Sequence, residues 1–205
     1  MIELYTAQTS NGQRVAIMLE ACGLPYRAHV LDLFKGEQTD PAFRRINPAG
    51  QIPAIVDSDG PDGKPFTLTQ SAAILLYLAE KTGRFMPVDV CRRAVAMQWL
   101  MQAMTDVACA SGGIFLLSRI APERSPANVA FFEERMLRFL RLADARLEGR
   151  EYLADELSAA DFALYPICAA RRSLVDAAAA ELPHLTLWMT RLGEDAAVTR
   201  AMAVA

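Results

Sequence analysis

The chain has 205 residues, of which 53% are hydrophobic and 22% charged, with a formal net charge of −3. This length fits one large domain or two small ones, and the composition excludes a disordered chain. The slight acidity argues against general nucleic-acid binding, which needs a clustered basic face. A small anionic ligand stays open, because backbone amides at helix starts can bind one.

Four cysteines are spread along the chain without a CxxC pair or a cysteine–histidine cluster: Cys22, Cys91, Cys109 and Cys168. The pattern predicts free thiols in a reducing cytosol, with neither a disulfide framework nor a metal site. No basic segment followed by an apolar one opens the chain, and we expect no apolar run of bilayer length. The prediction is a cytoplasmic protein without a membrane span.

The first part of the chain, to about residue 82, alternates strand-like runs with helical patterns. Strands are predicted over residues 3–5, 26–33, 52–56 and 65–68, and helices over residues 11–21, 41–45 and 70–82. Turn residues separate these elements, and Gly83 ends the last helix. The order β-α-β-α-β-β-α predicts an α/β domain with a mixed sheet over residues 1–82.

Beyond Pro87 the pattern changes to long segments of helical period without a convincing strand. Helices are predicted over residues 92–119, 127–148, 159–172 and 185–192, with breaks at Pro122, Pro126, Gly149 and Pro183. The residues from 82 to 89 are the expected linker. The predicted architecture is therefore an α/β domain followed by an all-helical domain over residues 88–205.

Two segments carry a resemblance to a known family. The first reads NPAGQIPAIVD over residues 47–57, and the second reads LTQSAAILLYL over residues 68–78. Together they resemble the N-terminal domain of cytosolic glutathione transferases, whose N-P-x-G-x-I/V-P-x-I/L and E/Q-S-x-A-I-x-x-Y-L segments form the glutathione site. More weakly, YLA at 152–154 and LSAADF at 157–162 resemble an element of the family's helical domain, with Asp155 where glycine is usual.

The resemblance implies a thioredoxin-like domain that binds glutathione as co-substrate, and a helical domain that shapes the second-substrate site. The segments TSNG at 9–12 and KGEQ at 35–38 are most similar to bacterial nu-class members and their fungal relatives. Those proteins are associated with glutathione-dependent disulfide reduction and peroxidase activity. The resemblance further implies a homodimer and no metal.

The same resemblance assigns five residues to glutathione binding. Ile52 precedes an implied cis-proline, Pro53, and pairs through its backbone with the cysteinyl unit; the plain alternative is an ordinary edge-strand start. Gln70 and Ser71 are implied to hold the γ-glutamyl carboxylate at a helix start, where the plain alternative is a cap. Gln38 is implied to contact the glycyl end.

The sulfur of glutathione is expected beside Thr9, Ser10 and Asn11, with Asn11 and Thr9 favoured over Ser10 by the resemblance. A free thiol titrates near pH 8.5, and lowering that pKa by about two units needs roughly 2.7 kcal/mol. Hydroxyl or amide donors at a helix start can supply this stabilisation, aided by the helix dipole. The alternative for all three is simple capping. Tyr5 is expected in the core.

Other polar residues are given plainer roles. Ser158 and Asp161 have capping-box spacing and are predicted to fold the helical domain. Asp106 is expected on a solvated helix face, with contact to the γ-glutamyl ammonium as the alternative. Neither His29 nor His184 has a neighbouring ligand pattern, so neither is expected to be catalytic.

The leading hypothesis is an enzyme that activates the glutathione thiolate for attack on an electrophile, a peroxide or a disulfide. No cysteine stands at the first helix start, which argues against thiol chemistry by the protein itself. One alternative is a non-catalytic protein-interaction or regulatory module of the same fold. Another is a zeta-type isomerase, which normally has a serine-rich cysteine motif that this chain lacks.

Overall fold

The computed structural model describes residues 1–204, which form two compact units. The first unit holds Met1–Arg84 together with the C-terminal segment from Gly193, and the second holds Phe85–Leu192. The return of the chain's end to the first unit is a feature that no local sequence pattern reveals. Each unit has its own hydrophobic core.

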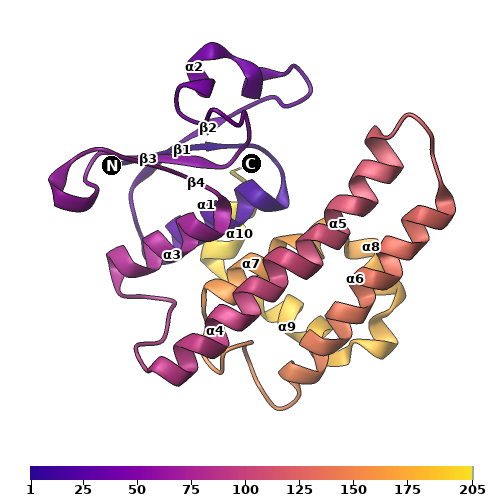
Figure 1. Cartoon of the computed structure of the whole chain (residues 1–205). Coiled ribbons are helices and arrows are strands. Elements are labelled where there is room, and N and C mark those ends of the chain that lie inside the picture. The colour runs from indigo at the N-terminus through magenta and orange to yellow at the C-terminus, as the bar shows by residue number, and fades with distance from the viewer. Residues whose placement is uncertain (205) are drawn as a thin grey trace. The chain divides into compact units, whose positions relative to one another are not determined.

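A mixed four-stranded sheet in the order β2-β1-β3-β4 forms the centre of the first unit (Figure 1). The strands are β1 (Ile2–Thr6), β2 (Tyr26–Val30), β3 (Ala54–Asp57) and β4 (Phe66–Thr69). Strand β1 pairs parallel with β2 and antiparallel with β3, and β3 pairs antiparallel with β4. This is the sheet predicted from the β-α-β-α-β-β-α order.

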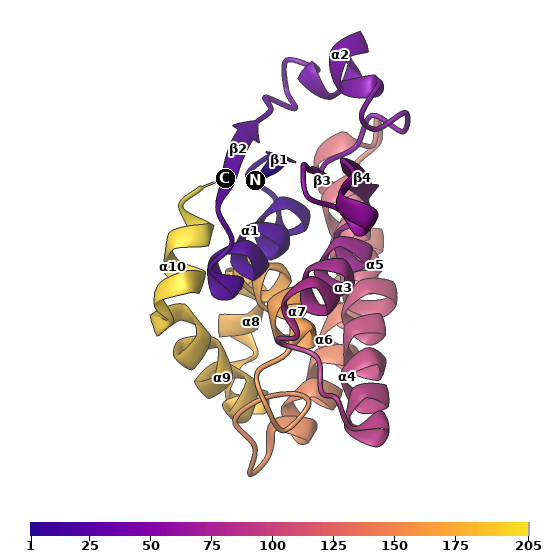
Figure 2. The same ribbon diagram turned by 90° about the vertical axis from the view of Figure 1, so that its left-hand side faces the viewer.

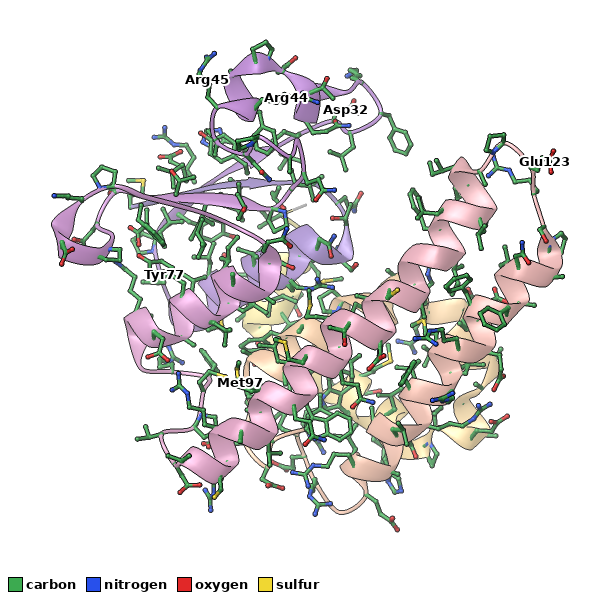
Figure 3. The ribbon with its side chains drawn as sticks, viewed as in Figure 1. Asp32, Arg44, Arg45, Tyr77, Met97 and Glu123 are labelled. Carbon is green, nitrogen blue, oxygen red and sulfur yellow. The ribbon has the colours of Figure 1, made fainter. Side chains whose placement is uncertain are left out.

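Two helices cover one face of the sheet, α1 (Ser10–Cys22) and α3 (Ser71–Thr82), and they pack against each other. Every residue of α1 from Gly12 to Leu19 is buried, because α10 (Ala196–Met202) packs against it as well (Figure 2). The α3 side chain Tyr77 (Figure 3) donates a hydrogen bond to the buried Asp57 carboxylate at 2.7 Å and so ties this helix to β3.

The connection from β2 to β3 carries the short helix α2 (Pro41–Arg44) and a 3₁₀ turn, Glu37–Thr39, and a second 3₁₀ turn, Pro61–Gly63, precedes β4. Strand β3 begins at Ala54, two residues later than predicted. Pro53 has no N–H to donate to a strand ladder, which explains the later start.

Helices alone make up the second unit among its described residues. They are α4 (Val90–Gln102), α5 (Ala108–Phe115), α6 (Pro126–Leu147), α7 (Ala159–Ala170), α8 (Arg172–Ala177) and α9 (Pro183–Glu194), with π-helical turns at Ala103–Val107 and Leu116–Ile120 and a 3₁₀ turn at Ala179–Glu181. An all-helical second half was predicted, but the separate short helix α8 of this unit and α10 of the first unit were not.

The segment Val90–Ile120 is one continuous helical run of 31 residues. By length and composition it is apolar enough to cross a membrane, so the expectation of no such run was wrong. Only 28% of its most apolar stretch is buried within the chain. The buried part packs on its own unit, where α4 contacts α7 and α5 contacts α6.

Asp161 organises the core of the second unit. Its Oδ2 accepts from the backbone N–H and the hydroxyl of Ser158, both at 3.0 Å, which is the predicted capping box at the start of α7. Its Oδ1 accepts from the backbone N–H of Leu153 at 3.1 Å and from Trp188 Nε1 at 3.0 Å. One buried carboxylate thus joins α7, α9 and the loop that connects α6 to α7.

Gly12 lets α1 approach β1 closely. A Cβ atom at this position would lie 2.2 Å from Thr6 Oγ1 and 2.5 Å from the carbonyl oxygen of Ala7. We expect Gly12→Ala to lower the free energy of unfolding by about 2 kcal/mol, because backbone cannot yield as a flexible side chain can. In denaturant unfolding, Gly112→Ala is the matched control, since that helical glycine has open space around its Cβ position.

The control is expected to gain about 1 kcal/mol from the higher helix propensity of alanine. Equal effects of the two substitutions would show that the approach of α1 to β1 is not constrained.

Candidate functional site

The start of α1 presents the three residues predicted to surround a sulfur. Thr9 is the N-cap, with extended φ and ψ of −138° and 156°, and its Oγ1 accepts from the backbone N–H of Gly12 at 3.2 Å. Ser10 is the first residue of the helix, and the Asn11 side chain is exposed. Capping by Thr9 leaves its hydroxyl hydrogen available to another acceptor.

The start of α3 presents the two residues predicted to hold a carboxylate. Gln70 has φ 68° and ψ 109°, in the region that L-residues rarely adopt, and such conformations persist where the surrounding structure imposes them. Ser71 follows as the first helical residue and is 5% exposed. The first N–H groups of a helix have no partner within it, so this turn suits an anion.

Arg14 joins the two helix starts. Its Nη1 donates to Asn11 Oδ1 at 2.8 Å and to Ser71 Oγ at 3.0 Å, although Arg14 and Ser71 are 57 residues apart. Its side chain is fully buried, and burial lowers the pKa of its guanidinium to about 10, so it stays charged at neutral pH. The sequence analysis missed this residue. The available signal was an arginine directly before the apolar run VAIML of the same helix.

The peptide bond between Ile52 and Pro53 is cis, as the resemblance implied. The preceding turn is held by the buried Asn47, whose Nδ2 donates to the carbonyl of Gln51 at 2.5 Å and whose Oδ1 accepts from the N–H of Ala49 at 3.2 Å. The turn therefore fixes the backbone that enters Ile52.

Strand register brings these segments to one end of the sheet. Ala54 pairs with Tyr5 of β1 on one side and with Thr69 of β4 on the other. Pro53 therefore precedes β3 where Gln70 follows β4 and where the chain leaves β1 toward α1. The cis-proline and the starts of α1 and α3 therefore lie at the same end of the sheet.

Gln38 lies in the 3₁₀ turn after β2 and contacts the turn that precedes Pro53. A Cβ atom added at Gly50 would lie only 3.1 Å from the backbone carbonyl oxygen of Gln38. The Gln38 Nε2 donates to the backbone carbonyl of Leu33 at 3.4 Å. Its Oε1 is buried without a hydrogen-bond partner among residues 1–204. On the same segment the exposed Lys35 forms an ion pair with Asp32 at 3.0 Å. Figure 3 labels Asp32.

Tyr5 faces the opposite side of the sheet from α1. It alternates with the buried Leu4 and Thr6, stacks on His29 with ring centroids 4.6 Å apart, and lines a pocket of about 370 Å³ with Phe43. It is half-buried there and not in the core as expected. This position separates Tyr5 from the start of α1, where the sulfur is predicted.

Asp106 belongs to the helical unit, where its Oδ1 lies 3.9 Å from Arg135 Nη2. This pairing on a partly exposed helix face agrees with the plainer of its two expected roles. Within residues 1–204, no three His, Cys, Asp or Glu side chains gather as metal ligands would.

Each half of the chain matches a domain of one known protein family. Residues 10–81 match the glutathione S-transferase N-terminal domain, and residues 104–195 match the glutathione S-transferase C-terminal domain. The disulfide-bond oxidoreductase YfcG of Escherichia coli is 37% identical over 205 residues, covering 98% of this chain and 94% of that protein. The disulfide-bond oxidoreductase YghU of the same organism is 32% identical, covering 99% and 74%.

Solved structures of glutathione transferases are also similar to this chain. A Burkholderia graminis glutathione transferase, crystallised with two glutathione molecules per subunit, has a TM-score of 0.91 and 35% identity, covering 98% of this chain and 87% of that one. A Pseudomonas putida glutathione transferase with one glutathione disulfide per subunit has a TM-score of 0.90 and 32% identity, covering 98% and 90%.

Proposed function

Because the chain belongs to the glutathione transferase family, we propose that it is a glutathione-dependent enzyme. It activates the glutathione thiolate at the end of the sheet where β3 begins and β4 ends. The main support is the shared guanidinium of Arg14, which holds Asn11 and Ser71 on one site. A tripeptide with a thiol and carboxylates fits such a site, because donors and a buried cation stabilise its anionic groups.

Each predicted residue receives one task in this proposal. The backbone of Ile52, a half-buried residue before cis-Pro53, offers an N–H and a C=O for strand-like pairing with a peptide. Ser71 and Gln70 hold a carboxylate at the start of α3, and Gln38 contacts the glycyl end. Thr9 and Asn11, with Ser10 beside them, donate to the thiolate. Glutathione supplies the nucleophile, since the chain has no cysteine at this position.

Among the electrophiles left open by the sequence, a disulfide is favoured. The relatives YfcG and YghU are disulfide-bond oxidoreductases, and the Pseudomonas putida structure contains glutathione disulfide. The thiolate attacks one substrate sulfur, the S–S bond breaks, and the other sulfur leaves as a thiolate that takes a proton. A second glutathione thiolate attacks the mixed disulfide, so two thiols form from the substrate and glutathione is oxidised to its disulfide.

A cytoplasmic homodimer is part of the proposal. Large apolar side chains stand exposed along the helical run from α4 to its final π-turn: Val90, Met101, Phe115, Leu116 and Ile120. Exposed apolar surface of this kind marks an interaction site, and a second copy of the chain is the occupant that the family implies. Reducing conditions suit its unpaired cysteines.

Calorimetric titration with glutathione and glutathione disulfide tests the function. We expect the wild type to bind, and Ser71→Ala to weaken binding about tenfold or more, because a hydrogen bond to a charged group contributes about 1.5–3 kcal/mol. Ser173→Ala, on the exposed face of α8, is the matched control and should bind as the wild type does.

A wild-type protein that ignores both ligands at millimolar concentration would refute the enzyme and favour the protein-interaction module. If Ser71→Ala binds both ligands with wild-type affinity, the start of α3 is not part of the binding site.

A further inference from the structure

The Arg14 guanidinium is a buried cation with unusually few partners. Among the described residues, Nη1 donates both of its hydrogen bonds, while the buried Nε and Nη2 have no partner. The other charged side chains of α1 and α10, Glu20 and Arg200, pair with each other at 2.7 Å. Burying a charged group costs free energy unless hydrogen bonds or an opposite charge compensate it, which points to a functional role for Arg14.

The chemistry of arginine fixes the direction of both hydrogen bonds. A guanidinium has only donors, so Asn11 must turn its Oδ1 toward Arg14, as the structure shows, and Ser71 must accept with its Oγ. The Asn11 amide therefore has its Nδ2 hydrogens free, and the Ser71 hydroxyl has its hydrogen free. Both side chains are left as donors at the site.

We propose that Arg14 is the positioning residue of this site, which fixes Asn11 and Ser71 as donors toward one anionic ligand. The ligand class is a thiol peptide with a carboxylate on its first residue and a thiolate on the next one, so the role rests on the proposed glutathione function. Because one guanidinium nitrogen donates to both side chains, Asn11 and Ser71 each direct their own hydrogens toward the ligand. Its charge also stabilises the two anions through the groups that contact them.

The test compares Arg14→Met with Arg14→Lys in the full chain. The probes are glutathione, whose bound thiol pKa is followed by ultraviolet absorbance of the thiolate, and S-methylglutathione, whose affinity is measured by calorimetry. We expect Arg14→Met to raise the pKa of the bound thiol by about one unit and to weaken S-methylglutathione binding about tenfold. Arg14→Lys, which keeps a donor-only cation, should recover much of both effects.

Thermal unfolding separates positioning from a structural role. Replacing an under-paired buried cation by an apolar side chain of similar length is expected to leave the Tm unchanged or higher. Arg27→Met, at an exposed position of β2, is the matched control and should leave the Tm, the thiol pKa and the affinity unchanged.

The outcomes distinguish this role from the function on which it rests. A wild-type protein that binds neither probe refutes the function itself. Wild-type binding with the same thiol pKa and affinity in Arg14→Met overturns the positioning role alone. A large fall in Tm with an unchanged thiol pKa in Arg14→Lys or Arg14→Met assigns the arginine to folding, which also overturns the proposal.

Discussion

Replacing Asn11 by alanine is expected to lower turnover of glutathione with a small disulfide by about 100-fold, the effect of losing one donor to a developing or resident anion. The Asn11 amide is held by Arg14 with its Nδ2 group free, and this group is the donor assigned to the thiolate. Without it the thiolate fraction at neutral pH falls, so the rise of turnover with pH should move to higher pH. Steady-state kinetics across pH measures both.

Folding is expected to survive this substitution, because Thr9 caps α1 through its own hydroxyl. Asn128→Ala, at an exposed position in the first turn of α6, is the matched control for turnover. If Asn11→Ala keeps wild-type turnover and pH dependence, the donor to the sulfur lies elsewhere, and Thr9 becomes the leading residue.

Asp161→Ala is expected to cost about 3–5 kcal/mol of unfolding free energy. The substitution leaves four buried donors without an acceptor, two from Ser158, one from Leu153 and the indole N–H of Trp188. Urea unfolding followed by circular dichroism and tryptophan fluorescence measures the loss, and Trp188 itself reports on the site.

Two further variants sharpen that result. Asp161→Asn should be nearly as harmful, since an amide NH₂ would face donors in place of one carboxylate oxygen. Asp176→Ala removes an exposed ion pair with Arg172 at 2.7 Å and should cost no more than about 0.5 kcal/mol. A small effect of both Asp161 variants would show that the helical unit does not depend on this carboxylate.

The fold was largely predictable because local patterns decide most of it. The apolar run of α1, the glycine after Thr82 and the Ser158–Asp161 spacing each mark an element that the structure contains. Failures arose where tertiary packing decides. The short helices α8 and α10 carry little periodicity, and the strand that includes Ile52 in the prediction begins only after Pro53.

The sequence indicated which segments to expect at the candidate site, but it did not indicate the hydrogen bonds that join them. The motifs around Pro53 and Ser71 identified the segments, and the bond before Pro53 is cis as expected. The link between the helix starts could not be read, because Arg14 reaches a residue 57 positions away and no sequence spacing encodes that contact. Tyr5 was misjudged because alternation along β1 does not say which face α1 covers.

The acidity of glutathione on the wild-type protein tests the central claim most directly. Ultraviolet difference spectra of the bound tripeptide, recorded as the pH is raised, give the pKa of its thiol. Donors at the start of α1 and the cation behind them predict a pKa about two units below the value near 8.5 of a free thiol. A bound thiol that titrates as it does in free solution would contradict the account.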